Sequence, residues 1–190
     1  MNENFRKQIS NIEDLVEISE ILSESTVLLE SISKYMKHPF DPQFSKDGHH
    51  IPMNFDKKGD TIYLLGEYHD RDEEADNSSN IEILYDAIEH KLVTSAHQLK
   101  GKGLFCGLVE ACAVKKLGFD ITSDSEMSEK DFLFDDRNPA ILVSVDGNQE
   151  DKFVDYMFNN GVRLTLLGHV TKGEMRLDDL SFGFINSFIE

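Results

Sequence analysis

Three short apolar runs place the strongest limits on how this chain can fold. They cover Thr61–Leu65, residues 140–145 and residues 162–170. The first two are too short for an ordinary helix and are mostly apolar at successive positions rather than at alternate ones, and the third is predicted to return as a further strand. Such runs are typical of strands that are buried on both faces. We therefore predict a sheet that carries helices against it.

The segments around these runs complete the predicted elements. Gly118 suits the C-terminal end of a helix, and Phe153, Val154, Met157 and Phe158 are expected to face inward from another. In the first half of the chain we predict a helix that Asn11 opens and caps, a strand at 26–32, a long loop at 37–60, a charged loop at 67–79 and a helix at 80–93. In the second half we predict a helix at 104–117, a strand at 119–122 and a helix after Asp146 and Asn148. A strand at 175–177 is expected beside 162–170, and a last helix is expected from Asp178 to Phe188.

Strands that alternate with helices indicate an α+β fold with a mixed sheet covered by helices. The order helix, strand, helix, strand near the C-terminus is a split β-α-β pattern, which predicts a partly ferredoxin-like topology. The 190 residues are enough for one domain with a real core and too few for two ordinary ones.

The charge balance limits the class of partner. The chain has 19 basic and 36 acidic residues, a net charge of -17. Binding to a nucleic-acid backbone requires a basic surface, so nucleic acid is not expected as a partner. The acidity is interpreted as a solvated surface, with a face for a basic partner as the alternative. No apolar run is long enough for a bilayer span and no signal sequence is visible, so we expect a cytoplasmic protein without a membrane partner.

The two cysteines, Cys106 and Cys112, lie six residues apart in an apolar segment. This spacing does not put them on one helix face, so we expect two buried free thiols. Neither a redox motif nor a zinc motif is visible. Two groups of residues have side chains of metal-ligand types: Glu67, His69, Asp70 and Asp72, and His49 and His50. Their spacing matches no known zinc motif, so no metal site is predicted.

Four segments in order resemble one known domain. They are residues 59–67 (GDTIYLLGE), residues 92–104 continuing to 109–111 (LVTSAHQLKGKGL, VEA), residues 133–145 (LFDDRNPAILVSV) and residues 167–171 (LGHVT). Together they resemble the C-terminal domain of formylglycinamidine ribonucleotide amidotransferase, or phosphoribosylformylglycinamidine synthase, of the aminoimidazole ribonucleotide synthetase superfamily. The resemblance implies a domain at residues 26–190 and an N-terminal helical extension at residues 1–25.

The chain departs from the family pattern at the polar positions. In the second motif, the family's Asp is Gln98, its Ser is Lys100, its acid is Gly101 and its first Gly is Lys102. In the third motif, the family's Glu is Asp136, its Ser is Arg137, its Gly is Pro139 and its Arg is Ala140. The family's preceding domain, which supplies most nucleotide and magnesium ligands, has no counterpart here. By resemblance alone the cofactors would be ATP and magnesium, and the partner would carry that ATP-binding domain.

The candidate ligand site follows the second motif. Glycines before a helix expose N–H groups that suit a phosphate, and the lysines add positive charge. Candidates for phosphate or ligand binding are His97, Lys100, Gly101, Lys102 and Gly103. Glu110 is added by resemblance, and Asp136 and Arg137 are added because a loop before a buried strand could present them to a ligand. The alternatives are a tight turn with solvated lysines, a solvated helix glutamate, and a local ion pair involving Asp136 and Arg137. No catalytic residue is identified.

Two functions remain open. In the first, the chain is a C-terminal domain or subunit of a phosphoribosylformylglycinamidine synthase-like protein, which carries out ATP-dependent amidation in purine biosynthesis, and it is not catalytic alone. In the second, it is a non-catalytic module that binds a nucleotide-like anion or a protein, and it forms a homodimer.

Overall fold

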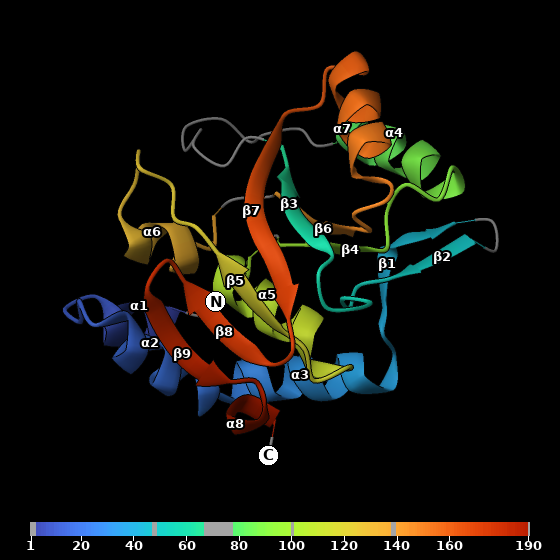
Figure 1. Cartoon of the computed structure of the whole chain (residues 1–190). Coiled ribbons are helices and arrows are strands. Elements are labelled where there is room, and N and C mark those ends of the chain that lie inside the picture. Colours follow the sequence, from blue (N-terminus) through green and yellow to red (C-terminus); the bar gives the residue numbers. More distant parts are fainter. Residues whose placement is uncertain (1–2, 47–48, 67–77, 100, 138–139, 190) are drawn as a thin grey trace.

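The computed structural model describes residues 3–46, 49–66, 78–99, 101–137 and 140–189 (Figure 1). Within these residues, a seven-stranded sheet has the order β4-β6-β3-β7-β5-β8-β9, and β1 and β2 form a separate antiparallel pair. Among the described strands of the larger sheet, only the β5–β8 pair is parallel. The strands are β1 Phe40–Lys46, β2 His49–Pro52, β3 Thr61–Leu65, β4 Ser95–Gln98, β5 Gly118–Ile121, β6 Ile141–Val145, β7 Leu164–Thr171, β8 Glu174–Leu177 and β9 Leu180–Phe184.

Eight helices lie around the described strands. They are α1 Glu3–Ile9, α2 Leu15–Ser23, α3 Thr26–Lys37, α4 Ser78–Glu89, α5 Leu104–Ala113, α6 Glu129–Phe134, α7 Glu150–Asn159 and α8 Asn186–Ile189. Leaving out α5, β5 and α6, which are inserted between β4 and β6, the chain order is β3-α4-β4-β6-α7-β7. The spatial order β4-β6-β3-β7 is the antiparallel arrangement of a ferredoxin-like core. The predicted α+β class with a mixed sheet and partly ferredoxin-like topology is therefore confirmed.

The central strand β3 is buried on both faces, as its apolar run predicts. Ile62 and Leu64 belong to the core cluster that includes residues of α1, α2, α3 and α5. Tyr63 and Leu65 belong to the opposite cluster, with side chains of α4 and α7. Figure 1 shows α4 and α7 together on one side of the sheet and α1 to α3 at its other end. Two layers of helices thus enclose the sheet around β3 and β6.

The prediction of a strand at residues 26–32 is wrong. These residues begin α3, whose first turn is capped by the Ser25 hydroxyl. The buried side chains of this helix are Leu28, Ile32 and Tyr35, a helical spacing that the neighbouring apolar residues hide in the sequence. The predicted loop at residues 37–60 is also wrong in part, because it contains the hairpin of β1 and β2.

The predicted N-terminal helix is displaced. Asn11 does not cap it; Asp14 caps α2 instead, accepting the N–H groups of Val16 and Glu17. Both α1 and α2 place side chains in the same core cluster as β3, among them Phe5, Ile18 and Leu22. The division of the chain into an extension at residues 1–25 and a domain at residues 26–190 stays a prediction.

The C-terminal prediction is wrong in two respects. Asp178 does not cap a helix, since it lies in a turn with a φ of 50° and accepts the N–H of Ser123. Strand β9 follows this turn, and only the short α8 comes after it. In addition, β8 lies beside β5 and β9 rather than beside β7. Of the side chains predicted to face inward from α7, Phe153 and Met157 are buried, whereas Val154 and Phe158 are exposed.

Besides β1, β2 and β9, three short elements have no counterpart among the predicted ones, namely α1, β4 and α6. Strand β4 contains the polar residues Ser95, His97 and Gln98, and α6 is only six residues long. Short elements with mixed composition carry too little periodicity to be recognised. The charged loop predicted at residues 67–79 falls mostly outside the described residues, and α4 begins at Ser78.

Gly118 has a different role from the one predicted. Helix α5 ends at Ala113, and Gly118 begins β5, where the backbone of the β7–β8 turn approaches it closely. A Cβ added here would overlap the carbonyl oxygen of Glu174 and lie 2.6 Å from the carbonyl carbon of Gly173. Absence of a side chain is therefore a packing requirement at this position.

We expect Gly118→Ala to destabilise the protein by about 1–3 kcal/mol, because the overlap involves backbone atoms that have little freedom to move. Gly147→Ala is the matched control, since no atom lies within 4 Å of its added Cβ; its effect should stay within about 0.5 kcal/mol. Urea unfolding followed by circular dichroism measures both. Equal stability of the two variants would show that the close approach is not tight.

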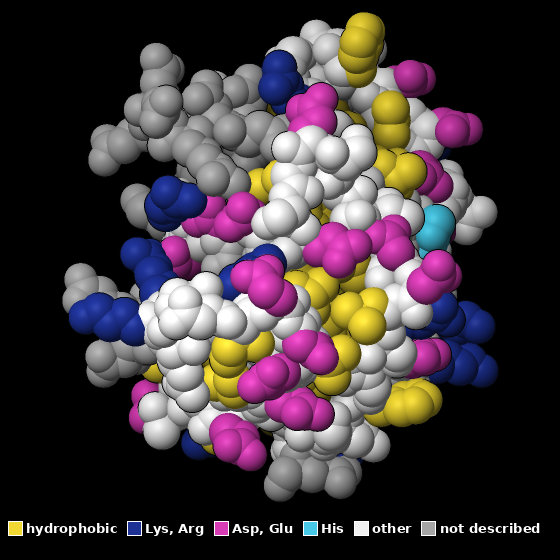
Figure 2. All heavy atoms as spheres, turned by 90° about the vertical axis from the view of Figure 1, so that its left-hand side faces the viewer, with side chains coloured by type: hydrophobic (Ala, Val, Ile, Leu, Met, Phe, Trp, Pro, Cys, Tyr) yellow, Lys and Arg dark blue, Asp and Glu magenta, His cyan; other side chains and the backbone are white. Residues whose placement is uncertain are grey.

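Charged side chains cover much of the surface. Figure 2 shows the left-hand side of Figure 1, where Asp and Glu side chains are scattered, with Lys and Arg side chains and exposed hydrophobic ones between them. This distribution agrees with the interpretation of the charge of -17 as a solvated surface. Among the described residues, no helix has the length and apolar character needed to cross a membrane.

Candidate functional site

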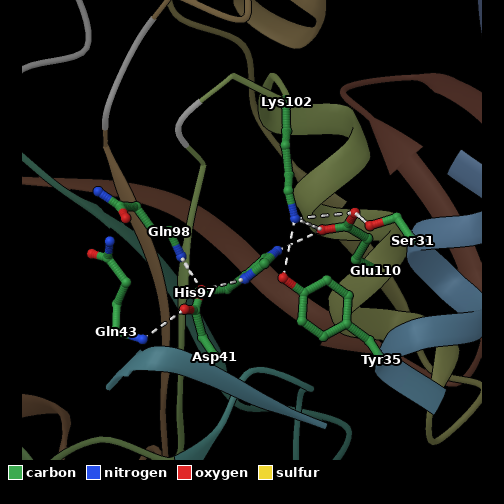
Figure 3. Close-up of polar contacts among 8 residues, drawn as sticks. All are labelled: Ser31, Tyr35, Asp41, Gln43, His97, Gln98, Lys102 and Glu110. Atoms are coloured by element: carbon green, nitrogen blue, oxygen red, sulfur yellow. Dashed lines mark hydrogen bonds and ion pairs between the residues drawn. The ribbon is translucent and has the colours of Figure 1, made fainter. Parts of the chain in front are cut away.

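A buried histidine lies at the centre of the candidate site. His97, on β4, is 1% exposed and lies between two carboxylates (Figure 3). Its Nδ1 is 3.2 Å from Oδ2 of Asp41, and its Nε2 is 2.6 Å from Oε2 of Glu110. The ring also meets the ring of Tyr35 edge-on, with 5.2 Å between centroids. This one imidazole, on β4, is thus contacted by residues of β1, α3 and α5.

Glu110 is the most heavily bonded member of the cluster. It lies on α5 and is 1% exposed. Besides His97, it accepts hydrogen bonds from the Ser31 hydroxyl and from Lys102, whose Nζ is 3.0 Å from Oε2 and 3.3 Å from Oε1. Both carboxylate oxygens therefore have partners within the chain.

Lys102 is turned toward this cluster. Its Nζ donates to the Tyr35 hydroxyl at 3.2 Å as well as to Glu110, and it lies 4.7 Å from the centroid of the Tyr35 ring. The ammonium group has three N–H donors, and these three oxygen partners account for them. Its positive charge is consequently held by Glu110 and Tyr35.

Asp41 ties β1 to β4. Its Oδ1 accepts the N–H of Gln43 at 3.0 Å, and its Oδ2 accepts the N–H of Gln98 at 3.2 Å in addition to the bond with His97. These bonds fix the carboxylate on the side of the imidazole opposite Glu110. The imidazole is accordingly held from both ends.

The local backbone brings these side chains together. Gly101 and Gly103 have φ values of 74° and 79°, a region that favours glycine, and they turn the chain from β4 into α5. Gly107 allows α5 to approach this turn, because an added Cβ would overlap the Leu99 side chain and lie 3.7 Å from Cδ2 of His97. The close approach places Glu110 beside His97.

The electrostatics favour a fully charged cluster. Burial would raise the pKa of Glu110, but the hydrogen bond and charge of His97 and the charge of Lys102 outweigh it and lower this pKa to about 2. Burial would likewise raise the pKa of Asp41, yet the hydrogen bonds from His97 and from Gln43 lower it. Both carboxyl groups are therefore ionised at neutral pH.

The two cations respond in the opposite sense. Burial would lower the pKa of His97, but its hydrogen bonds to Asp41 and Glu110 raise it. Burial would also lower the pKa of Lys102, and the charge of Glu110 raises it instead. With His97 protonated, two negative and two positive charges cancel, and both ring nitrogens donate. In that protonation state the cluster is internally neutral.

The structure joins only some of the predicted site residues. His97, Lys102 and Glu110 form the cluster, and Gly101 and Gly103 shape the turn beside it, whereas Lys100 lies outside the described residues. Asp136 and Arg137 belong elsewhere: Asp136 pairs with Arg6 of α1, and Arg137 pairs with Asp135 at 2.6 Å. They line a separate hollow of about 270 Å³ with Lys130.

Three members of the cluster were not predicted from the sequence. Ser31 and Tyr35 lie on α3, which was predicted partly as a strand, and Asp41 lies in the predicted loop. No spacing signal links these residues to His97, because 56 or more positions separate them along the chain. Only the tertiary packing of α3 and β1 against β4 and α5 reveals them.

Two of the described candidates hold their positive charges within the chain. The positive charges of Lys102 and Arg137 already have carboxylate partners. Within the described part of the chain, no three His, Cys, Asp or Glu side chains gather in a way that could hold a metal ion. The metal-ligand types at Glu67, His69, Asp70 and Asp72 lie outside the described residues, as does the side chain of His49. Cys106 and Cys112 are free and buried, as predicted.

Comparison with known proteins gives consistent sequence matches, although no family model matches the chain. Over 140 residues the chain is 29% identical to the phosphoribosylformylglycinamidine synthase subunit PurL of Carboxydothermus hydrogenoformans, which covers 63% of this chain and 19% of the relative. It is 30% identical over 141 residues to the same subunit of Leuconostoc mesenteroides, covering 62% of this chain and 18% of the relative. The chain thus spans about a fifth of the length of these curated relatives.

Solved structures show the same fold. PurL of Thermotoga maritima complexed with ATP matches with a TM-score of 0.63 and 12% identity, covering 76% of this chain and 28% of that one. PurLQS from Thermotoga maritima matches with a TM-score of 0.61 and 15% identity, covering 70% and 26%. The sequence matches and the shared fold together identify the chain as PurL-like, a relative of one part of the phosphoribosylformylglycinamidine synthase subunit PurL.

Proposed function

We propose that the chain acts in purine biosynthesis as a PurL-like domain that works with a partner and is not catalytic alone. The observation that carries the proposal is the state of the segment that most resembles the family, residues 96–110. Its His97, Lys102 and Glu110 bond to one another and to Tyr35, Ser31 and Asp41, so their charges are already satisfied. Such a cluster stabilises a wall of a site better than it binds a phosphate.

The partner would supply the ATP-binding part. In the family, the amide oxygen of formylglycinamide ribonucleotide is phosphorylated and then displaced by ammonia. Phosphoryl transfer depends on positioning and on neutralising charge, which requires cations free to meet the phosphates. Since Lys102 and Arg137 are paired within the chain, we assign that role to the partner. The structures of PurL with ATP and of PurLQS support this assignment by likeness, and a cytoplasmic location belongs to the same proposal.

The second candidate is a non-catalytic module that binds a nucleotide-like anion or a protein and forms a homodimer. The inward position of Lys102 favours it, because this lysine replaces a family glycine and neutralises Glu110 from within the chain. The two candidates differ in one respect that can be measured: only the first gives an active complex with an ATP-binding partner.

The test is an assay for ADP release with ATP, magnesium, formylglycinamide ribonucleotide and ammonia. We expect no turnover by the purified chain, and turnover when a protein carrying the ATP-binding part is added. Binding of the two proteins is measured separately by size-exclusion chromatography with light scattering. Turnover by the chain alone would refute the dependence on a partner. A complex without turnover, or no complex, would reject the enzyme-component proposal in favour of the non-catalytic module.

A further inference from the structure

A cavity of about 360 Å³ adjoins the His97–Glu110 cluster and has no role in the function proposed above. It lies between α1, α2 and α3 on one side and the Gly101–Lys102 turn and α5 on the other. Much of its wall is apolar, from Phe5, Ile21, Leu22, Val27, Leu28 and Cys106. Its volume falls in the range of sites for small molecules, which are typically apolar with a few polar groups.

The polar end of this cavity carries no charge that a ligand could readily use. Of the described residues that line the cavity, Lys102 supplies the one positive charge, and its three donors already meet Glu110 and Tyr35. An anionic ligand would have to displace one of these partners and would face the carboxylates of Glu110 and Glu24 in the same wall. Because replacing these bonds costs free energy, the cavity disfavours phosphates and carboxylates.

A cationic ligand is disfavoured for a related reason. Glu110 accepts hydrogen bonds at both oxygens from Ser31, His97 and Lys102, and Lys102 is positively charged. A further cation would meet the repulsion of Lys102 and find the carboxylate already paired. An uncharged ligand avoids both penalties.

Ser31 gives the cavity one point of polar recognition. Its hydroxyl proton is donated to Glu110, which leaves the lone pairs of the Ser31 oxygen as acceptors. Figure 3 shows Ser31 and Lys102 both directed at the Glu110 carboxylate. A ligand hydroxyl or N–H group at this end can donate to Ser31, while the apolar part of the ligand covers the remaining wall.

We propose that this cavity binds an uncharged, mostly apolar small molecule that carries one hydroxyl or N–H donor. Removing the apolar surface of such a ligand from water supplies the driving force. The donor group sets its orientation against Ser31. ATP and sugar phosphates are anionic, so they are not the ligands expected in this cavity.

The test uses N-phenyl-1-naphthylamine, an uncharged apolar fluorophore with a single N–H donor. We expect a saturable increase in its emission with one site per chain, and at least tenfold weaker binding to Val27→Trp, whose side chain enters the cavity. Leu29→Trp is the matched control: Leu29 is on the same helix and similarly exposed, 45% against 49% for Val27, but does not line the cavity. Thermal melting verifies that both variants are folded.

The outcomes are distinct. Replacing the N–H of the probe by a methylene group, as in 1-benzylnaphthalene, should weaken binding about threefold to tenfold if Ser31 accepts a hydrogen bond, the equivalent of about 1 kcal/mol. No saturable binding, equal binding to Val27→Trp and Leu29→Trp, or displacement of the probe by ATP would each overturn the proposal. None of these measurements depends on turnover, so the proposal can fail while the proposed function stands, and the reverse.

Discussion

Replacing Glu110 with alanine is expected to destabilise the protein by about 3–5 kcal/mol, the cost of breaking a buried ion pair by removing one partner. Glu110 lies between His97 and Lys102 and accepts hydrogen bonds from both. Without it, the buried His97 ring loses one of its two carboxylate partners and keeps Asp41, and Lys102 loses its carboxylate partner and keeps the neutral Tyr35 hydroxyl. The free energy of unfolding from urea denaturation measures the loss.

Two further variants separate the possible causes. Glu110→Gln keeps the size of the side chain and removes its charge, so a loss close to that of Glu110→Ala assigns the effect to electrostatics. Glu82→Ala removes an exposed carboxylate from α4, and its effect should lie within about 0.5 kcal/mol. A loss below 1 kcal/mol in Glu110→Ala would contradict a charged, coupled cluster.

The pH dependence of the Glu110→Gln effect provides a second measurement. The pKa of Glu110 is lowered from its ordinary value of 4.5 to about 2, so its ionised form is the stabilising one. This contribution is complete above pH 4.5 and is lost as the pH falls through about 2. The pKa of His97 is raised above 6.5, so its own contribution is complete below that value and is lost as the pH rises through the raised pKa. The difference between the native protein and Glu110→Gln should therefore be largest between about pH 5 and pH 6.

Part of the cluster could be predicted from the sequence. Residues 96–110 resemble a known motif, and this singled out His97, Lys102 and Glu110. What it could not give is the direction of the Lys102 side chain, because a lysine after a glycine turn can equally extend into solvent. Tyr35 helps to decide that direction by providing a partner for Lys102 from a distant segment, beside the Glu110 carboxylate. Long-range packing, rather than local pattern, determines whether the loop is open or closed.

The prediction of the fold is limited in the same way, because local sequence patterns do not show which residues pack together. Runs of apolar residues correctly predicted β3 and β6, because strands buried on both faces need such residues at every position. At residues 26–32 similar composition gives a helix. There, Leu28 is buried while Val27 and Leu29 are 49% and 45% exposed, so the apolar residues do not mark the buried face. Three consecutive apolar residues carry no periodicity that distinguishes helix from strand.

Helix α7 allows a test, on two phenylalanine side chains, of whether an apolar residue marks the buried face of a helix. The sequence predicts that Phe153 and Phe158 both face inward, but the structure leaves Phe158 81% exposed and buries Phe153 completely. Phe153 packs against Tyr63 of β3, with 5.5 Å between ring centroids. The helix therefore uses a narrower apolar face than the one predicted.

We expect Phe153→Ala to destabilise the protein by about 3–5 kcal/mol, because it leaves a cavity between α7 and the sheet. Phe158→Ala, at the other end of the same helix, should change stability by no more than about 0.5 kcal/mol. Both variants remove the same atoms and make the same change in helix propensity, so the difference between them isolates burial. Urea unfolding of the two proteins measures it. A loss above 2 kcal/mol in Phe158→Ala would mean that this side chain is covered in solution, and a loss below 1 kcal/mol in Phe153→Ala would contradict the packing of α7 on β3.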